Sequence, residues 1–400
     1  MAFTNPGYRR LWAASLLANS SRMMQRILLI WLVLDLGGSP LQVALIGIFG
    51  MSPMLIVGMF SGFFADRFNR QRLMGITLSA ECITAIIMLS LLALGTINYW
   101  HTYLAALVTG SIWALEFPAR RSLIFDLLGS SGITNGMALD AGSMNASKMA
   151  GPILGGVLIA MVSVTGGYLC IAIFHAIAAL IIWSTKLPQT KTLTSSDGPV
   201  LRNVYEGLRY VLGNKPILAV VLITVIMNML AFPYIQMIPV IARDVLNVGP
   251  ELMGLLMAGH GIGAVLGTGI IASTTTSHHG RIYLGGSLLA LTCLILFTFS
   301  RSYFISLPIL ILSGFGFAGF AVMQSTITLL VSKTDMRGRA LGIISLAIGS
   351  GPFGMILLGW LATSHSPTFA IFVNASLGLI MICLIGILMP SLVKKIQQRT

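Results

Sequence analysis

The stretch Gly62-Phe-Phe-Ala-Asp66-Arg67-Phe-Asn69-Arg70-Gln-Arg72 places four charged side chains within seven residues, between two long apolar runs. The run before it covers about 42–65, and the run after it covers about 73–97. Each run reaches the ~20 residues that a helix needs to cross the hydrocarbon layer of a membrane. The stretch is therefore predicted to be a short charged loop at a membrane surface.

The rest of the chain repeats this pattern. Hydrophobic residues make up 56% of its 400 residues, charged residues make up only 9%, and the mean hydropathy is +0.91. A soluble protein carries about 25% charged residues, so a soluble globular protein is excluded. Because backbone groups in lipid must be paired internally, continuous apolar runs predict helices. We predict an all-α membrane protein with twelve transmembrane helices, at about 11–35, 42–65, 73–97, 101–117, 136–162, 167–185, 217–241, 251–273, 282–299, 304–331, 340–363 and 367–389.

The basic residues are unevenly distributed among the loops. Nineteen of the 24 Lys and Arg lie near the N-terminus, in the even-to-odd loops or in the C-terminal tail, and only Arg243 and Arg301 lie in the opposite loops. Cytoplasmic loops carry the excess of Lys and Arg, so both termini are predicted to be cytoplasmic. This arrangement explains the net charge of +13 without a nucleic-acid partner.

A long polar stretch divides the spans into six and six. Its later part, Val200–Leu212, is amphipathic, which is typical of a helix lying on the inner membrane surface. Gly151-Pro152 in the fifth span recurs as Gly351-Pro352 in the eleventh. Two pseudo-symmetric halves of six helices are typical of transporters with a substrate site between the halves. The predicted parts are a bundle at 1–185, a cytoplasmic linker at 186–215 and a bundle at 216–400.

Two motifs resemble those of the major facilitator superfamily. Residues 62–72 resemble its signature loop, G-x-x-x-D-R-x-G-R-R/K, with Asn69 in place of the second glycine and Gln71 in place of a basic residue. Asparagine tolerates a left-handed backbone, which is the conformation expected for Asn69. Gly151-Pro152-Ile-Leu-Gly155-Gly156 is similar to the G-P-x-x-G-G motif of exporters and antiporters in that superfamily.

Three more stretches are similar to the bacterial drug-efflux branch that includes the macrolide and enterobactin exporters. They are Arg9-Arg10-Leu-Trp12, Phe117-Pro-Ala-Arg120-Arg121 and Arg337-Gly-Arg339-Ala-Leu-Gly342. The resemblance implies a secondary active transporter in the cytoplasmic (inner) membrane. Such a transporter exports a small organic molecule, such as a drug, a siderophore or an acid-bearing metabolite, by alternating access.

The resemblance also implies a gating role for the loop. Gly62, Asp66, Arg67 and Arg70 belong to it, with Asp66 facing the N-terminal end of span eleven and Arg70 pairing with Asp126 as a latch. The alternative is that the arginines serve only as cytoplasmic topology signals.

The second motif implies a helix bend. In the family, the bend formed by Gly151, Pro152, Gly155 and Gly156 seals the cavity against proton leak. Close packing of the small residues against another helix explains the motif equally well.

Ionisable residues inside spans are costly and often functional. Arg22, Arg26 and Lys148 lie near the middle of their spans, and Gln25 is a hydrogen-bonding neighbour for the two arginines. We assign these four residues to a substrate cavity. The middle of these spans holds more basic than acidic groups. This excess of positive charge favours an anionic substrate, unless the nearby acids neutralise the bases.

Three groups are candidates for carrying protons: Glu81, Asp140 and His260. Alternatives remain for each, namely a structural ion pair for Glu81, a first-turn acid favoured by the helix dipole for Asp140 and packing for His260. Glu116 is expected at the membrane interface, paired with Arg120.

In the second half, polar residues lie within apolar spans. Asn228, Tyr234, Gln236 and Gln324 are candidates for cavity contacts, and interhelical hydrogen bonding is the alternative for each.

No motif for other chemistry is present. The sequence contains no GxxxxGK[ST] loop, GxSxG or HExxH, so we expect neither an enzyme nor a cofactor or metal. The expected partners are a small-molecule substrate, protons and membrane lipid, with the chain acting as a monomer and the proton gradient as energy source. An importer or uniporter of a metabolite or lipid on the same fold is the alternative; a receptor without transport would leave the polar midplane residues unexplained.

Overall fold

The computed structural model describes residues 2–67, 69–185, 200–273, 278–333 and 336–392, with the backbone alone at 55–67, 130, 131, 134, 200–203, 272 and 391. All regular structure in these ranges is helical, as predicted. The chain forms two compact units: Met1–Ser196 with Gly249–Ala258, and Asp197–Val248 with Gly259–Thr400.

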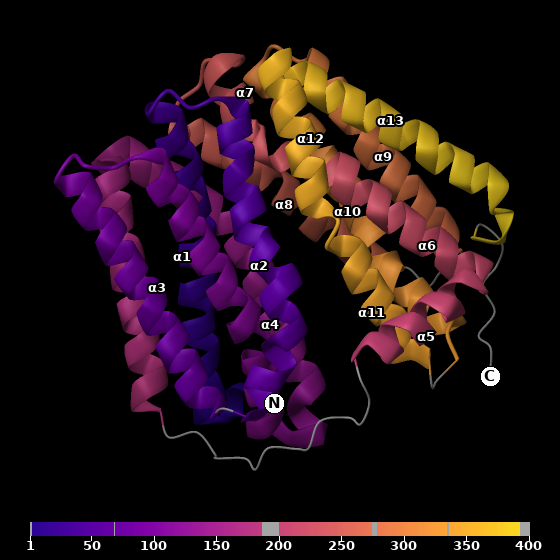
Figure 1. Ribbon diagram of the computed structural model, residues 1–400, viewed down its shortest axis with the longest axis horizontal. Helices are drawn as coiled ribbons and strands as arrows, with labels where there is room; N and C mark the ends of the chain where they lie inside the picture. Colours follow the sequence, from indigo (N-terminus) through magenta and orange to yellow (C-terminus); the bar gives the residue numbers. More distant parts are fainter. Residues whose placement is uncertain (1, 68, 186–199, 274–277, 334–335, 393–400) are drawn as a thin grey trace. The chain divides into compact units, whose positions relative to one another are not determined.

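The first unit is built around one long helical stretch, α4. Helices α1, α2 and α3 each pack along it (Figure 1). Non-helical backbone at Gly129, with φ 62°, and at Ser163, with φ 71°, divides α4 into three helical segments. The elements of this unit are η1 Ala2–Thr4, α1 Pro6–Asp35, α2 Pro40–Arg67, α3 Arg70–Ala93 and α4 Tyr99–Ser184, with the start of α8.

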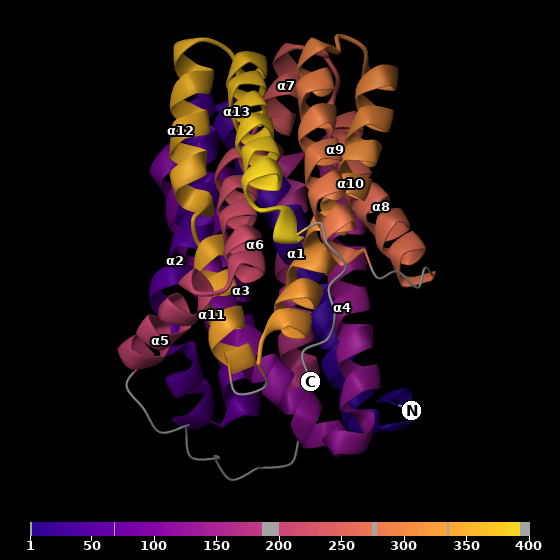
Figure 2. The ribbon, with the colours of Figure 1, turned by 90° about the vertical axis from the view of Figure 1, so that its right-hand side faces the viewer.

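In the second unit, α9 packs against both α10 and α13 (Figure 2). The elements are α5 Val200–Leu212, α6 Lys215–Ile226, η2 Met227–Ala231, η3 Phe232–Gln236, α7 Ile238–Asp244, the rest of α8 Pro250–Ser273, α9 His279–Phe299, α10 Tyr303–Val331, α11 Arg337–Ile348, α12 Gly351–Ser364, α13 Pro367–Leu388 and η5 Pro390–Leu392. The predicted amphipathic helix is α5; residues 186–199 of the predicted linker lie outside the described residues.

Asparagine side chains fix where several helices begin. Asn5 accepts a hydrogen bond from the backbone N–H of Tyr8 at 3.1 Å, and so begins α1. Asn98 begins α4, where His101 accepts the backbone N–H of Asn98 at 3.0 Å in return. The first N–H groups of a helix have no intrahelical partner, and such caps stabilise it by about 1 kcal/mol.

Eight helices in the described ranges are long and apolar enough to cross a membrane, judged by length and composition. One of them, Asn135–Ser184, is 50 residues long and contains two predicted spans, 136–162 and 167–185. Pro40–Met54 is a shorter apolar helix. The chain is therefore a multi-pass helical protein, and the count of twelve spans stays a prediction.

Glycines allow the backbones of α9 and α10 to touch. A Cβ added to Gly286 would lie 2.7 Å from the carbonyl oxygen of Gly316, and a Cβ added to Gly316 would lie 2.6 Å from the carbonyl oxygen of Gly286. Real Cβ atoms do not approach backbone this closely, so any larger residue would push the two helices apart. This contact is an example of the small-residue packing by which membrane helices associate.

We predict that Gly286→Ala lowers the free energy of unfolding by roughly 1–3 kcal/mol because of this overpacking. Its neighbour Gly285 offers a matched control, since a Cβ there meets nothing within 4 Å. Gly285→Ala is expected to be neutral or more stable by about 0.5–1 kcal/mol. Thermal melts of the purified variants in detergent measure both; equal melting temperatures would contradict the close packing.

Candidate functional site

Charged side chains meet inside the first unit, where α1, α3 and α4 pack together. Arg22 of α1 holds Glu81 of α3 at two points, with Nε 2.6 Å from Oε1 and Nη2 3.0 Å from Oε2. Its Nη2 also contacts Oε2 of Glu116 in the first segment of α4. The exposed fractions are 7% for Arg22, 2% for Glu81 and 0% for Glu116. These ion pairs are therefore buried and link three helices.

A second buried arginine extends this group. Arg120 lies 3.7 Å from Oε1 of Glu116 and 3.4 Å from Oδ1 of Asp140, which is in the second segment of α4. The side-chain oxygen of Asn19 accepts hydrogen bonds from both arginines, at 3.2 Å from Arg22 and 3.3 Å from Arg120. The two arginines are thus parts of one network.

His175, in the third segment of α4, completes the network. Its Nδ1 lies 3.1 Å from the carbonyl oxygen of Ile171, and its Nε2 lies 2.7 Å from Oε2 of Glu81. A neutral imidazole with its proton on Nε2 donates to Glu81 alone. A protonated imidazole donates both to Glu81 and to the carbonyl oxygen of Ile171, so one additional proton would satisfy both contacts together.

We call these six side chains the buried charge cluster: Arg22, Glu81, Glu116, Arg120, Asp140 and His175. Within the cluster, two arginines contact three carboxylates. The positive charge of Arg121, outside the cluster, also acts on Asp140. A proton on His175 would offset the third carboxylate inside the cluster itself.

The sequence-based expectations are partly corrected here. Glu116 is paired with Arg120, as expected, but its buried carboxylate also contacts Arg22, which was not expected. Its place at the membrane interface stays a prediction. His175 was not among the expected functional residues. The available signal was an ionisable residue within the predicted span 167–185, which is the criterion that singled out Glu81.

The other expected cavity residues of this unit lie apart from the cluster. Gln25 donates to the hydroxyl of Thr109 at 3.3 Å rather than bonding to its arginine neighbours. Among the described side chains, neither Arg26 nor Lys148 forms a hydrogen bond or an ion pair.

The predicted contact of the cytoplasmic loop is present. Nη1 of Arg70 donates to both carboxylate oxygens of Asp126, at 2.8 and 2.7 Å. The side chains of Gly62, Asp66 and Arg67 lie outside the described residues.

The two departures from the loop motif have structural explanations. Asn69 is not left-handed, with φ −59°; its side chain begins α3 by accepting the N–H of Arg72 at 3.0 Å. Gln71 donates to the carbonyl oxygen of Ile182 at 2.9 Å, and so joins α3 to the end of α4. Both residues replace the motif residues with side chains that tie the loop to its own unit.

The glycine–proline motif brings α4 close to α1. A Cβ on Gly151 would lie 3.3 Å from the carbonyl oxygen of Ser20, and one on Gly155 would lie 3.3 Å from Cβ of Ile27. Pro152 is buried in the same stretch, and a Cβ on Gly156 would meet the backbone of Pro250, in the same unit. These contacts agree with the packing interpretation, and sealing against proton leak stays a prediction.

The polar candidates of the second unit form neutral hydrogen bonds. Asn228 donates to the carbonyl oxygen of Thr224 at 2.9 Å, and Gln324 donates to the hydroxyl of Thr224 at 2.7 Å. The hydroxyl of Tyr234 lies 2.9 Å from Nδ1 of His260. Gln236 is buried, and its amide has no hydrogen-bond partner among the described residues. The bonds of Gln324 and Tyr234 agree with an interhelical role, whereas the bond of Asn228 lies within its own span.

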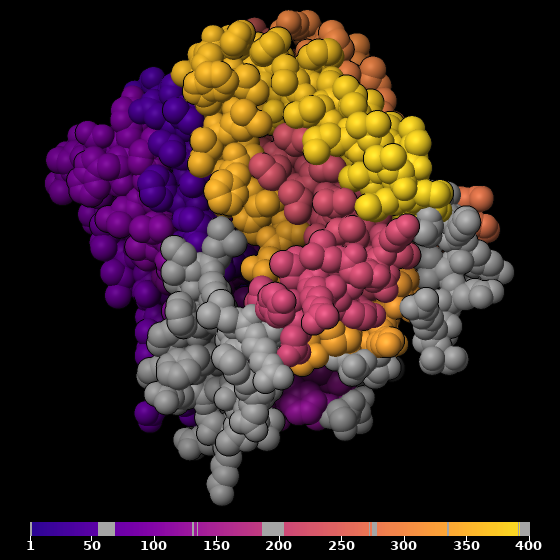
Figure 3. Space-filling model, turned by 45° about the vertical axis from the view of Figure 1, so that its right-hand side comes forward, coloured from indigo at the N-terminus to yellow at the C-terminus, as the bar shows by residue number. Residues whose placement is uncertain are grey.

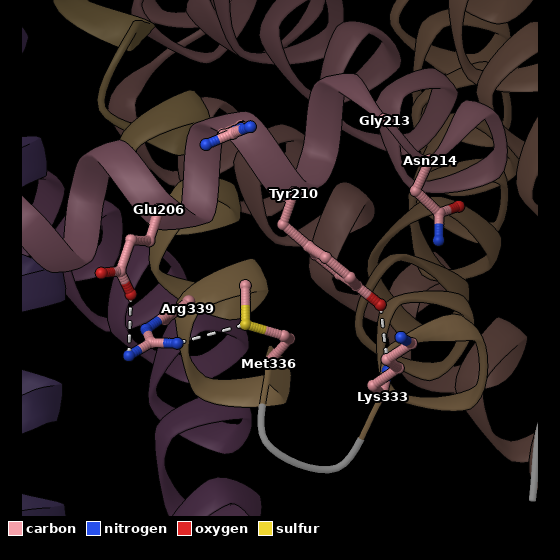
Figure 4. A pocket seen from close by; sticks show the side chains of 8 residues that line it. Glu206, Tyr210, Gly213, Asn214, Lys333, Met336 and Arg339 are labelled. Carbon is pink, nitrogen blue, oxygen red and sulfur yellow. Dashed lines mark hydrogen bonds and ion pairs between the residues drawn. The ribbon is translucent and has the colours of Figure 1, made fainter.

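A surface pocket of about 480 Å³ lies between α5 and the start of α11. Figure 3 shows α5 and α6 at the surface beside α11. In the close-up, Glu206 pairs with Arg339 at 2.9 Å, and the hydroxyl of Tyr210 accepts the backbone N–H of Lys333 at 3.0 Å (Figure 4). These contacts fasten the amphipathic helix to the second unit. The pocket is lined by residues of the polar stretch before α6, of the loop before α11 and of the first turn of α11, so it lies outside the predicted spans.

We predict that Arg22→Leu destabilises the protein by about 3–5 kcal/mol, since it leaves two buried carboxylates without their arginine. Arg22→Lys keeps the charge but loses the two-point geometry, so its melting temperature should lie between those of Arg22→Leu and the wild type. Arg72 is exposed, and Arg72→Leu serves as the control for losing an arginine at the surface. A melting temperature of Arg22→Leu equal to that of this control would contradict the cluster.

Comparisons with known proteins agree with this architecture. The family model described as transmembrane secretion effector matches residues 2–398. The multidrug efflux pump Tap of Mycolicibacterium fortuitum is 26% identical over 95% of this chain and 94% of its own length. The staphyloferrin A transporter of Staphylococcus aureus is 22% identical, with 82% of each chain covered. The crystal structure of the nucleoside transporter NupG superposes with a TM-score of 0.76 at 12% identity, covering 95% of this chain and 98% of the other, which shows the fold alone.

Proposed function

Because this chain belongs to the transmembrane secretion effector family of major facilitator transporters, we propose that it exports a small organic molecule across the cytoplasmic membrane in exchange for protons. The relatives named as a multidrug efflux pump and as a siderophore transporter support export of a drug, a siderophore or an acid-bearing metabolite. The fold supports alternating access, in which the two halves expose a midplane site to one side at a time.

The proposed topology has twelve spans, with both termini in the cytoplasm. The distribution of Lys and Arg among the loops supports this orientation, and the eight apolar helices, one of which contains two predicted spans, support nine of the twelve spans. We propose the monomer as the working unit, with bundles at 1–185 and 216–400 joined by the linker at 186–215.

The buried charge cluster carries the proposal of proton exchange. Nε2 of His175 lies 2.7 Å from Glu81, and within the cluster two arginines contact three carboxylates. Both observations support a bound proton at this contact. Glu81 and His175 are therefore the proposed proton carriers, while Asp140 is held by Arg120.

Proton release follows from the burial of this site. When the proton leaves, the cluster has an unbalanced charge that is costly away from water. The deprotonated form is therefore stable only in a conformation that admits water to the cluster. Release of the proton and change of access then become one event, which is the condition for exchange against a substrate.

The cytoplasmic loop is the proposed latch of this cycle. The ion pair of Arg70 with Asp126 fixes the start of α3 to α4, and the family motif supports a gating role for Asp66. Uptake or uniport on the same fold remains the alternative, and the direction and energy source of transport separate the two.

We predict that Glu81→Gln abolishes gradient-driven transport, because two arginines then face two carboxylates and the extra proton is no longer needed. His175→Gln should retain proton coupling with a shifted pH dependence, since three carboxylates still face two arginines. The measurement is dye movement in proteoliposomes with an imposed pH gradient, using a panel of fluorescent organic acids and cations.

The exposed His365 provides the matched control, and His365→Gln should behave as the wild type. If a protonophore leaves wild-type transport unchanged, proton exchange is wrong and uniport is favoured. If Glu81→Gln keeps its full response to the gradient, the assignment of the proton to this contact is wrong.

A further inference from the structure

Two basic side chains remain once the buried charge cluster is complete. They are Arg26 of α1 and Lys148 in the second segment of α4, and within the described part of the chain neither has a hydrogen bond or ion pair. The buried carboxylates of the first unit cannot serve them, because each contacts an arginine of the cluster. The sequence alone left open whether nearby acids neutralise all three midspan bases; the structure shows that only Arg22 is neutralised in this way.

The packing of α1 on α4 places these two cations in one stretch of the contact between the helices. The hydroxyls of Ser20 and Ser147 lie 3.1 Å apart, and further along the same two helices Gly155 packs against Ile27. Lys148 follows Ser147 at one end of this stretch, and Arg26 precedes Ile27 at the other. Like charges on neighbouring helices repel each other.

The surface around Lys148 does not resemble a surface that faces lipid. Lys148 is exposed, and so are Asn145 and Ala141, which lie one and two turns earlier on the same face. Large hydrophobic side chains are exposed on either side of this stretch, at Phe125 and Leu154, but none of those described between them is. In contrast, α3 exposes a series of them, Ile76, Ile83, Ile86 and Ile87. Since a cation facing hydrocarbon costs at least about 2.5–3.5 kcal/mol, this stretch favours contact with water over contact with lipid.

We propose that Arg26 and Lys148 bind the acidic group of the transported molecule, so that the substrates are organic anions. This inference rests on the proposed export function and names its substrate class. An oxyanion between the two side chains would replace their mutual repulsion with two attractions. The guanidinium group can hold a carboxylate at two points, and the ammonium group adds a compact positive charge.

The same arrangement excludes the opposite charge. A cationic molecule would meet two uncompensated positive charges, and no carboxylate of the buried charge cluster is free to attract it. In this proposal the buried charge cluster binds the proton, and Arg26 and Lys148 bind the acidic group of the substrate.

Binding of a matched pair of dyes to the full-length protein in lipid nanodiscs tests this proposal. One probe is a xanthene dye with a free carboxylate, and the other is the methyl ester of the same dye. In fluorescence anisotropy, Arg26→Gln and Lys148→Gln should each weaken binding of the acid roughly tenfold to a hundredfold, as expected for a lost charge-assisted bond. Binding of the ester should change by less than about twofold. Lys148→Arg, which keeps the positive charge, should bind the acid about as tightly as the wild type does. Arg209→Gln, which removes an exposed arginine of α5, should have no effect on either dye.

Thermal stability gives a second readout that does not depend on the choice of dye. Because the cations repel each other, Arg26→Gln and Lys148→Gln should raise the melting temperature of the ligand-free protein. A panel of organic acids should stabilise the wild type more than the double variant. A lowered melting temperature, equal weakening of both dyes or no acid-specific stabilisation in the panel would overturn the proposal.

These measurements are made at equilibrium without a proton gradient. If the protein binds the acid selectively but its transport does not respond to the gradient, proton exchange is wrong and the anion site stands. If export is driven by the gradient but binding shows no preference for the acid, the anion site is wrong and proton exchange stands.

Discussion

The contact between Arg22 and Glu81 joins α1 to α3 in a place where neither charge can turn to water. The other members of the buried charge cluster are linked to this pair directly or through one another. Glu116 shares the guanidinium group of Arg22, Arg120 compensates Glu116 and Asp140, and His175 approaches the far oxygen of Glu81. Buried ion pairs contribute little net stability compared with apolar packing, but removing one partner is costly. The cluster therefore fixes the relative placement of α1, α3 and all three segments of α4.

The two units differ in how their buried polar side chains are paired. The first uses full charges and concentrates them at one point. The second uses neutral bonds, such as those that bring Asn228 and Gln324 to Thr224, and it brings α9 and α10 together through Gly286 and Gly316. Among the described residues, the buried ion pairs are thus concentrated in the first unit. In the second unit the imidazole of His260 bonds to the hydroxyl of Tyr234.

Much of the local structure could be predicted from the sequence because it depends on short-range patterns. Apolar runs predicted the helices, and the amphipathic period predicted α5. The pairing of Arg70 with Asp126 came from the resemblance of the loop motif. The partners of the midspan side chains could not be predicted in the same way, because the sequence gives the depth of a residue along a span but not the rotation of the helix. The spacing of four residues predicted the contact of Glu116 with Arg120, but not its contact with Arg22. His175 gains its significance only from Glu81, which is distant in sequence.

The short contact between His175 and Glu81 joins α3 to the third segment of α4 through two side chains that are both buried. Each helix supplies only one of the two groups, so a movement that separates the helices breaks the contact and changes the surroundings of both. In the proposed exchange, the affinity for the proton is therefore set by the distance between two helices and not by one side chain.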